Sequence, residues 1–533
     1  MSHWAKAPMD RKQVLLFFPT LDDSISEDHP VRLYDEILAG CDWSSWESQY
    51  VLVAGQPPIP PRVVASAILY GFSQGIRSSR ALERMCKNSL DYIWLVHGHR
   101  IDHTTFCKFR TRFARELKEL FRQIGRIALN MGFACLDTVG LDGSRVRANS
   151  SRHQTASAET LQKRLEELDR RIEQIMAEAA EADAQEGRLF GDISANKLPS
   201  ELASLSKRQE KLRKAMVAVE KKQSADKTSP ALPGRDGASK SPNSKEPKVP
   251  VADPDSDVLP NKEGGYAPNY TTIAATETRN GFIVDAEVIS GGDEGGQTVE
   301  SVDRIEENFD ETPRQLLADT NFGSGENLAE LQERKVEAYI PVRRNADCKD
   351  NPAQRTDPTQ AVAEQDWPKL PRNVRTKKLD RSAFVYDQSA DCYYCPMGNK
   401  LQFAGMQTKP RKNGPAEYRI YRGQGCSDCA LSGECLTGRA VRRTICRDKY
   451  EPLREKMDAR MNSPTGQKIY QQRKWLAETP FAIIKARMGL RQFLLRGIEK
   501  VRTEWLWACT GFNLAKLARC IARLRVQTVA AAA

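Results

Sequence analysis

The stretch DTVGLDGS, residues 137–144, has the apolar character of a short strand and places Asp142 near its end. A second apolar stretch, RQLLAD at residues 314–319, ends at Asp319 in the same way. The glycine-rich sequence NFGSGEN follows directly and predicts a turn, because glycine and asparagine favour turn conformations. Two acidic residues therefore stand at the ends of two predicted strands.

The elements around these strands follow a definite order. YTTIAATETR and FIVDAEVIS flank Asn280-Gly281, which is a strong β-hairpin signal because both residues tolerate a positive φ. Helices are predicted near residues 297–308 and 328–335, and a further strand at 336–344. The order strand, hairpin, helix, strand, helix, strand predicts an α/β fold with an RNase H-like core, in which helices flank central strands.

Asp142 and Asp319 have the chemistry of metal ligands. Ligands of open α/β sheets gather at strand ends near the crossovers. Two carboxylates that meet there repel each other unless a cation lies between them. Mg²⁺ or Mn²⁺ is expected, since both prefer oxygen ligands. Taken singly, each aspartate is equally compatible with a turn cap.

A third carboxylate, Glu478, lies in the helix-forming stretch IYQQRKWLAETPFAIIKARMGL, residues 469–490. Lys485, seven residues later, is expected on the same helix face, where it would meet a phosphate bound at the carboxylates. Pro480 predicts a kink or a helix start near Glu478. A surface ion pair is the alternative for a lone glutamate among basic residues. If Glu478 points away from the aspartates, the next candidates are Glu499 and Glu504.

The net charge of +11 is concentrated at the C-terminal end of the chain. From Leu436 onward there are 21 lysines and arginines but 7 aspartates and glutamates. This excess indicates a polyanionic partner, most simply nucleic acid; a solvated basic helix surface is the alternative. No apolar run approaches the ~20 residues of a membrane helix, and the N-terminus lacks a secretory signal. We therefore expect a cytoplasmic, nucleoid-associated protein with no membrane partner.

Seven of the 13 cysteines cluster in residues 348–446. In a long chain without a signal peptide, clustered cysteines indicate metal ligands before disulfides. The pairs Cys392-x-x-Cys395 and Cys426-x-x-Cys429 suit a tetrahedral zinc site, and reduced cysteines on a small β insertion are the alternative. All six histidines precede this region, so a zinc site here would be all-thiolate.

Taken together, the motifs resemble those of bacterial insertion-sequence transposases of the DDE superfamily. The matching stretches are LDGSRVRANSS around Asp142, LADTNFGSGENL around Asp319, the cluster Tyr470, Arg473, Glu478 and Lys485, and residues 493–517. The N-terminal stretches HPVRLYDEIL and DHTTFCKFRTRF are similar to the family's helical DNA-binding segment. The resemblance touches nearly the whole chain except residues 158–262.

This resemblance implies a DNA transposase that cleaves the ends of a mobile element and joins them to target DNA. The implied metal-binding triad is Asp142, Asp319 and Glu478. Phosphate contacts are expected from Arg473, Lys474, Lys485 and Arg496. Arg473 stands one residue further from Glu478 than in many relatives, whereas Lys474 has the usual spacing. Trp475, Trp505 and Trp507 either stack on unpaired bases or, for at least two of them, pack between helices.

The resemblance also selects four possible zinc ligands, Cys395, Cys426, Cys429 and Cys435, with Cys392 as a substitute for one of them. The expected partners are double-stranded DNA, as element ends and as target, and a second copy of the chain in a homodimer on DNA. Two alternatives remain open: an RNase H-like nuclease without strand transfer, and a non-enzymatic zinc-containing DNA-binding protein.

The predicted organisation has seven segments. A helical DNA-binding domain, helix-turn-helix-like or a plain bundle, precedes the first core strand, and leucine heptads then indicate an antiparallel hairpin or a dimerising coiled coil. A Ser-, Pro-, Asp- and Lys-rich stretch is expected to be a disordered linker. The segments are the helical domain 1–133, the first core strands 134–157, the coiled coil 158–222, the linker 223–262, the continued core 263–345, the Cys-rich insertion 346–455 and the basic C-terminal helices 456–533.

Overall fold

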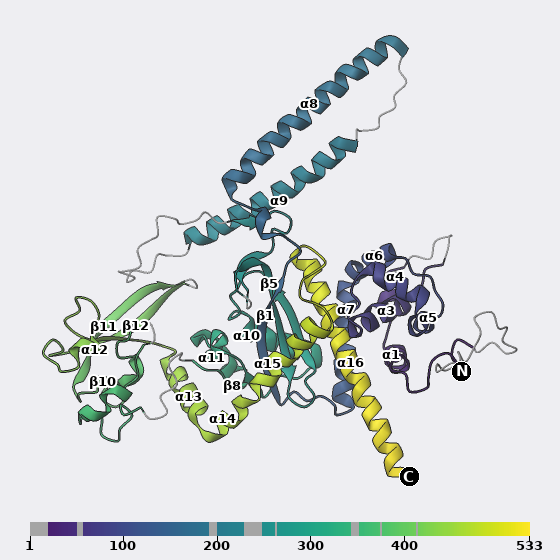
Figure 1. Ribbon diagram of the computed structural model, residues 1–533. Coiled ribbons are helices and arrows are strands. Elements are labelled where there is room, and N and C mark those ends of the chain that lie inside the picture. Colours follow the sequence, from purple (N-terminus) through teal and green to yellow (C-terminus); the bar gives the residue numbers. More distant parts are fainter. Residues whose placement is uncertain are drawn as a thin grey trace, which may run out of the picture.

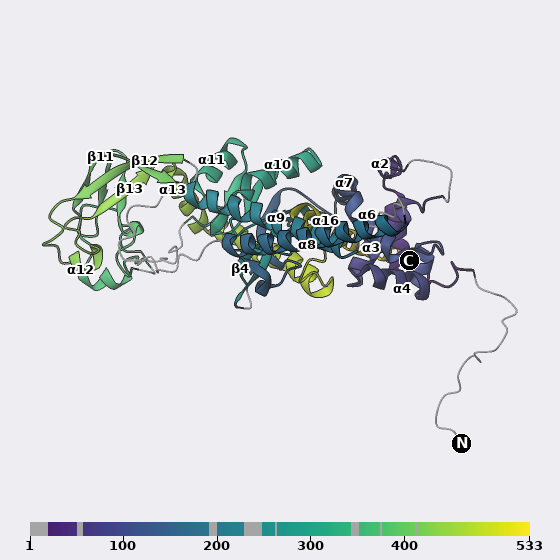
Figure 2. The same ribbon diagram turned by 90° about the horizontal axis from the view of Figure 1, so that it is seen from above.

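The computed structural model of the chain describes residues 20–50, 57–190, 200–228, 248–261, 264–342, 351–373, 376–411 and 414–532. Figure 1 shows a central sheet with a bundle of N-terminal helices on one side and a smaller β-rich part on the other. A view turned by 90° shows these parts in a row, with two long helices lying over the core (Figure 2). None of the described helices is both long and apolar enough to span a membrane.

The central sheet is built around β1 (Thr138–Arg147), which carries Asp142. β1 pairs antiparallel with β5 (Tyr266–Glu277) and parallel with β7 (Gln315–Leu317). The strands follow the predicted order, and Gly281 takes the positive φ of 76° that the hairpin turn requires. The other strands of this sheet are β8 (Glu337–Tyr339) beside β7, and β4 (Asp257–Pro260) and β6 (Ile283–Ile289) beside β5.

Helices cover both faces of the sheet. Because side chains alternate along a strand, Leu141 packs into the core on one face, whereas Gly140 and Asp142 point to the other. The resulting three layers place the strand that carries Asp142 between two helical layers. The helices on the Leu141 face are α10 (Gln297–Phe309) and α11 (Gly325–Glu333), and those on the Asp142 face are α15 (Arg473–Ala482) and α16 (Ile498–Ala532).

The N-terminal helices pack against α16. The Trp507 ring lies 6.1 Å from that of Trp46, and its indole N–H donates to the carbonyl of Arg110 at 3.2 Å. Asp102 caps the helix that begins at His103, since the Thr105 amide donates to its carboxylate at 2.7 Å. The helices are α1 (Pro30–Ala39), α2 (Ser44–Glu47), α3 (Pro61–Ser73), α4 (Ser79–Asn88), α5 (Leu90–Leu95), α6 (His103–Arg112) and α7 (Ala114–Asn130).

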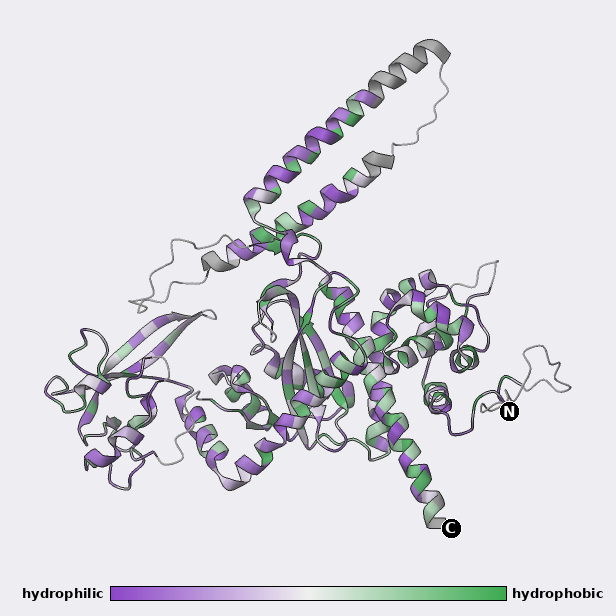
Figure 3. Ribbon diagram, viewed as in Figure 1, coloured by the Kyte–Doolittle hydropathy of each residue, from purple (hydrophilic) through white to green (hydrophobic). Residues whose placement is uncertain are grey.

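Two long helices, α8 (Ala158–Phe190) and α9 (Ser200–Thr228), project from the core as a pair (Figure 1). Their buried leucines Leu161, Leu168 and Leu212 share one apolar cluster, so the heptad seam lies between the two helices of the same chain. Figure 3 shows that the rest of this arm is mostly hydrophilic. Of the two predicted arrangements, the structure therefore has the intramolecular hairpin.

The predicted linker 223–262 is partly structured. α9 continues to Thr228, and β3 (Val249–Pro250) pairs with β2 (Thr155–Ala156), while β4 joins the central sheet. Residues 229–247 and 262–263 lie outside the described residues. Short strands like β3 are held by partners that are distant in sequence, so local composition did not reveal them.

The Cys-rich part forms a separate five-stranded antiparallel sheet of strand order β13-β12-β11-β10-β9. It continues through α13 (Glu451–Asn462) and α14 (Pro464–Gln471) into α15, so this sheet is joined to the helix that covers Asp142. Its strands are β9 (Val385–Asp387), β10 (Cys392–Tyr394), β11 (Lys400–Arg411), β12 (Gly414–Gly423) and β13 (Thr444–Asp448), with the short helix α12 (Ser432–Cys435) before β13.

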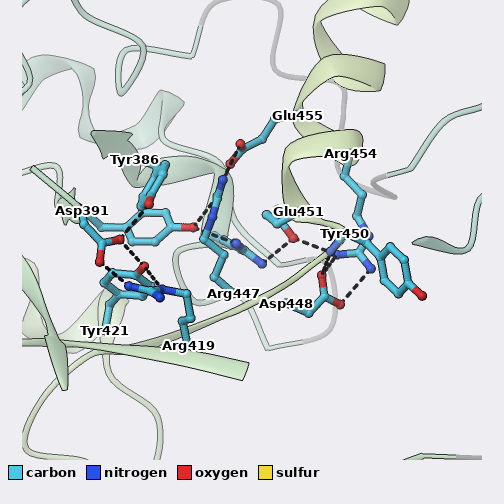
Figure 4. Close-up of polar contacts among 12 residues, drawn as sticks. Tyr386, Asp391, Arg419, Tyr421, Arg447, Asp448, Tyr450, Glu451, Arg454 and Glu455 are labelled. Atoms are coloured by element: carbon cyan, nitrogen blue, oxygen red, sulfur yellow. Dashed lines mark hydrogen bonds and ion pairs between the residues drawn. The ribbon is translucent and has the colours of Figure 1, made fainter. Parts of the chain in front are cut away.

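Buried ion pairs fix the joint between β13 and α13 (Figure 4). Arg447 donates to Glu455 at 2.9 Å and to the Tyr393 hydroxyl at 3.1 Å. The Glu451 carboxylate, whose side chain is 3% exposed, accepts from Arg454 at 2.8 Å and from a second arginine, Arg381, at 2.9 Å. Buried charges of this kind hold a fixed geometry because leaving one unpaired is costly.

We predict that Glu451→Ala destabilises the protein by about 3 kcal/mol, because it removes the carboxylate partner of Arg381 and leaves Arg454 with Asp448 alone. Urea unfolding followed by tryptophan fluorescence measures this. The control is Glu300→Ala, which removes a 61% exposed carboxylate 3.7 Å from Arg304 and is expected to cost less than about 1 kcal/mol. Equal effects of the two substitutions would show that the joint is not held by this pair.

Candidate active site

Asp142 lies in the middle of β1, not at its end as predicted. β1 is longer than its apolar stretch because its polar second half pairs with β5 as far as Arg147. The neighbouring strand β7, however, pairs with β1 only as far as Gly140. Asp142 is therefore the first acidic residue of β1 beyond the end of its pairing with β7. On the β7 side of the strand, its position is equivalent to a strand end.

Asp319 follows β7 and begins a turn of 3-10 helix, η2 (Thr320–Phe322). Its carboxylate accepts from the amide of Asn321 at 2.8 Å, and Ser324 then caps α11. The glycine-rich turn thus orients the Asp319 side chain at the carboxyl end of its strand, as the sequence predicts.

The two aspartates share one arginine. The Arg473 guanidinium donates from Nη2 to Asp142 Oδ1 at 2.9 Å, and the same nitrogen lies 3.8 Å from Asp319 Oδ2. The side chains of Asp142 and Asp319 are 16% and 33% exposed, so the group is half-buried but open to solvent. Two acids that are far apart in sequence therefore converge around a single cation.

A close approach of α15 to β1 positions this arginine. A Cβ atom on Gly140 would lie 2.8 Å from the Cβ of Leu476, so only glycine admits the helix at this distance. Leu476 packs with Leu317 and Tyr339 of the neighbouring strands, which sets the orientation of the helix about its axis in this structure. Arg473, one turn earlier, consequently faces the aspartates.

Glu478 lies on the same helix but is not brought to the aspartates. The buried face of α15 contains Leu476, Ala477 and Pro480, whereas Glu478 is exposed. Five helical residues separate it from Arg473, which turns its direction by about 140° around the helix. The structure thus places two members of the predicted triad together and the third on the outer side of α15.

The alternative glutamates have other partners. Glu504 pairs with Arg77 at 2.5 Å and accepts from the amides of Leu494 and Leu495 at 3.0 and 2.9 Å, so it holds the loop before α16. Glu499 is 81% exposed and pairs with Arg502 at 3.0 Å. Arg77 escaped sequence reasoning because its partner lies more than 400 residues away.

Sequence reasoning also missed Glu294, between β6 and α10. A Cβ atom on Gly143 would lie 2.5 Å from the carboxyl carbon of Glu294, so this acid touches β1 beside Asp142. The side chain of residue 143 would point to the opposite face of the strand from Asp142. No local signal marks Glu294 as different from other loop acids.

Lys485 lies against β1 rather than on the outer face of the helix. Its ammonium donates to Ser144 Oγ and to the carbonyl of Arg145, both at 2.6 Å. It belongs to a π-helix, η5 (Ile483–Arg487), which changes the angular position of residues after Pro480. The predicted shared face of Glu478 and Lys485 is therefore wrong, and so is a helix start at Pro480, which lies inside α15.

The other predicted DNA-contacting residues surround this region. Lys474 and Trp475 are exposed on α15, Trp475 with 39% of its surface, whereas Trp505 and Trp507 are buried in the helical core. Arg496 donates to the carbonyl of Asn149 at 2.8 Å, next to the end of β1. Two of the three tryptophans thus pack between helices, as one interpretation expected.

Four cysteines of the second sheet share a cavity of about 30 Å³: Cys395, Cys426, Cys429 and Cys435. Burial raises the pKa of Cys435 to about 11 and also raises the pKa of Cys395, so both are protonated at neutral pH unless a cation is bound. Cys392, 3% exposed in β10, lies outside this cavity.

Within the described ranges, no group of three or more His, Cys, Asp or Glu side chains is close enough to hold a metal ion. The four thiols therefore share a cavity without standing at ligand distances, and Glu478 does not complete the aspartate pair. The donor chemistry nevertheless fits two kinds of ion. Paired carboxylates that already surround a cationic group suit a hard divalent ion, and four thiols suit zinc.

Two family models match the chain. The model described as "Transposase DDE domain" matches residues 394–518, which include Arg473, Glu478 and the four cysteines, and "Transposase domain (DUF772)" matches residues 19–112 of the helical bundle. No curated protein and no solved structure matches the chain. A DDE domain implies an RNase H-like core, DNA binding and the use of divalent metal ions. The two matches indicate an insertion-sequence transposase of the DDE type, an enzyme that cleaves DNA and transfers its strands.

Proposed function

We propose that Asp142, Asp319 and Glu478 together hold the divalent ions of this transposase, Mg²⁺ or Mn²⁺, and so form its active site. The observation that carries this proposal is the single guanidinium group, that of Arg473, within 2.9 Å of Asp142 and 3.8 Å of Asp319. Divalent ions bound between such carboxylates activate the attacking oxygen and stabilise the leaving oxygen of an in-line phosphoryl transfer.

Glu478 joins this site by a rotation of α15 about its axis. The helix is anchored to β1 through Leu476 and through Lys485 on the π-helix, and π-helices are frequent at functional sites. Such a rotation moves Glu478 towards the aspartates and moves Arg473 away from them.

Arg473, Lys474, Lys485 and Arg496 then bind the phosphates of the DNA strand at the site. Divalent ions would neutralise the carboxylates of Asp142 and Asp319 that Arg473 contacts in this structure. Arg473 would then pair with a DNA phosphate in their place. Lys485 holds the β1 backbone at Arg145, which keeps the strand beside Asp142 in place.

We further propose the remaining organisation. Residues 1–133 form the DNA-binding domain, 134–157, 263–345 and 456–533 form the catalytic core, 158–222 form a coiled-coil hairpin insertion, 223–262 link it to the core and 346–455 form a Cys-rich insertion. The protein acts as a homodimer on DNA, because transposition must hold two element ends together.

We predict that Asp142→Asn, Asp319→Asn and Glu478→Gln each reduce cleavage of the element-end DNA by at least about 10³-fold, because each loses several kcal/mol of transition-state stabilisation. DNA affinity, measured by gel shift in EDTA, stays near the wild-type value. Strand transfer into a plasmid is assayed in parallel, since a nuclease would cut without joining.

The control for these variants is Glu499→Gln, which removes an exposed acid from the neighbouring helix and keeps full activity. Cleavage by Asp142→Asn at the wild-type rate would contradict the whole site. Loss of activity in Glu499→Gln with activity retained in Glu478→Gln would move the third ligand to α16.

We predict that Arg473→Gln makes folding depend on divalent ions. Without the guanidinium, two half-buried carboxylates repel each other, which costs about 1 kcal/mol in EDTA. Mn²⁺ replaces the lost cation and raises the melting temperature of the variant more than that of the wild type. The control Arg502→Gln removes a comparable ion pair on α16 and shows no such recovery. Identical Mn²⁺ effects in all three proteins would contradict a metal site between the aspartates.

We propose that Cys395, Cys426, Cys429 and Cys435 bind a structural Zn²⁺, supported by their common cavity. Purified protein is expected to contain one zinc ion per chain by elemental analysis. Cys435→Ser loses this zinc, whereas Cys392→Ser, the matched change outside the cavity, retains it. Zinc lost from Cys392→Ser and retained by Cys435→Ser would reverse the assignment.

A further inference from the structure

A second cavity, of about 390 Å³, lies at the far end of β1. Its volume falls in the range of small-molecule sites. Among the described residues that line it, two are arginines and none is acidic. The polar side chains in its wall belong to Arg147, Ser150, Arg152, His153, Asn261, Tyr266 and Gln492.

The walls of this cavity are held by backbone hydrogen bonds. The Arg147 amide donates to the carbonyl of Arg491 at 3.3 Å, and the Phe493 amide donates to the carbonyl of Arg147 at 2.8 Å. The Gln492 side chain donates to the carbonyl of Ala148 at 3.1 Å. The end of β1 and the loop before α16 therefore form one rigid wall, and residues 147, 148 and 150 belong to the motif around Asp142.

The opposite wall of the cavity is formed by the turn that contains Gly264 and Gly265. Gly264 and Gly265 have φ values of 92° and 73°, and a Cβ atom on either would lie within 4 Å of none of the described residues. Tyr266 follows them with 62% of its surface exposed, which is unusual for a large aromatic side chain. An exposed ring at the rim of a polar, positively charged cavity is the arrangement that binds a nucleobase by stacking.

The cavity lies beyond the aspartates along β1. Arg147 is five residues beyond Asp142 on β1, which corresponds to about 17 Å. Lys485 lies between the two, at Ser144 and Arg145. Duplex DNA advances about 3.4 Å per nucleotide, and an unwound strand spans more, so the cavity lies about five nucleotides or fewer from the phosphate at the aspartates.

We propose that this cavity binds one unpaired nucleotide of the element-end DNA, close to the cleavage site. Tyr266 stacks on the base, Asn261 and Gln492 offer amide groups to its edge, and Arg147 and Arg152 neutralise the adjoining phosphates. This inference rests on the proposed active site, because the path of the strand begins at Asp142.

The test uses the full-length protein and duplexes of the element's terminal sequence with 2-aminopurine placed in turn at each of about five positions on either side of the cut. Fluorescence is measured in EDTA, so that it does not depend on metal or cleavage. We expect a several-fold rise at one position, because the base leaves the neighbouring DNA bases that quench its fluorescence. Tyr266→Ala and Gln492→Ala abolish this rise, whereas Arg334→Ala, a basic-residue change at the end of α11, leaves it intact. No rise at any position, or the same rise in Tyr266→Ala, would overturn the proposal.

Binding affinity gives a second readout. Tyr266→Ala is expected to weaken binding about tenfold, since a stacked base contributes about 1–3 kcal/mol. An abasic nucleotide at the fluorescent position removes this difference between wild type and variant. Deoxynucleoside monophosphates supplied alone are not expected to bind. Saturable binding of a free nucleotide that Tyr266→Ala abolishes, without any rise in duplex DNA, would assign the cavity to a free nucleotide and contradict the proposal.

The outcomes separate this inference from the proposed active site. Asp142→Asn is expected to lose cleavage while keeping the fluorescence rise. If it keeps both, the active-site assignment fails while the nucleotide site stands. If it loses cleavage and the wild-type protein shows no rise, the nucleotide site fails while the active site stands.

Discussion

The contact between α15 and β1 is the constraint on which the rest of the site depends. Gly140 admits the backbone of the helix, and Leu476 fills the space that a side chain would occupy. This contact brings a helix from the C-terminal part of the chain against the strand that carries Asp142. It also sets the positions along that strand at which Arg473 and Lys485 contact it. A larger residue at position 140 would lift the helix and separate the arginine from both aspartates.

The same contact links the site to distant parts of the protein. α15 follows α13 and α14, and α13 is held to the Cys-rich sheet by the ion pairs of Arg447 and Glu451. On its other side, the loop between η5 and α16 is fixed by Glu504 and Arg77, which ties it to the N-terminal helices. The segments that precede and follow the helix of the candidate third ligand are therefore both held by buried charges.

Much of this arrangement was predictable from local patterns. Strong sequence signals mark the hairpin at Asn280-Gly281, the strand before Asp319 and the helices of the heptad segment. The structure contains the hairpin, the strand and the two long helices α8 and α9. Asp142 was placed at a strand end because its apolar stretch stops there, whereas pairing with β5 extends the strand to Arg147. The convergence of Asp142 and Asp319 followed from strand order alone.

Other features depend on contacts that no local pattern reveals. The π-helix after Pro480 changes the direction of Lys485, and helical periodicity assumes that no such change occurs. β3 and β4 lie in a stretch whose composition is typical of a linker, and they are formed by pairing with distant strands. The ion pair between Arg77 and Glu504 joins the N-terminal helices to the C-terminal part of the chain. No local sequence pattern marks either residue as a partner of the other.

The most direct test of the central claim is a crystal structure of the protein with Mn²⁺ and element-end DNA, with the metal located by anomalous scattering. The account predicts anomalous peaks at Asp142 and Asp319, about 4 Å apart if two ions bind, with Glu478 turned inward as a ligand and Arg473 moved onto a phosphate. Peaks at Asp142 and Asp319 with Glu478 still on the outer side of α15, and another acid such as Glu294 as the third ligand, would contradict it.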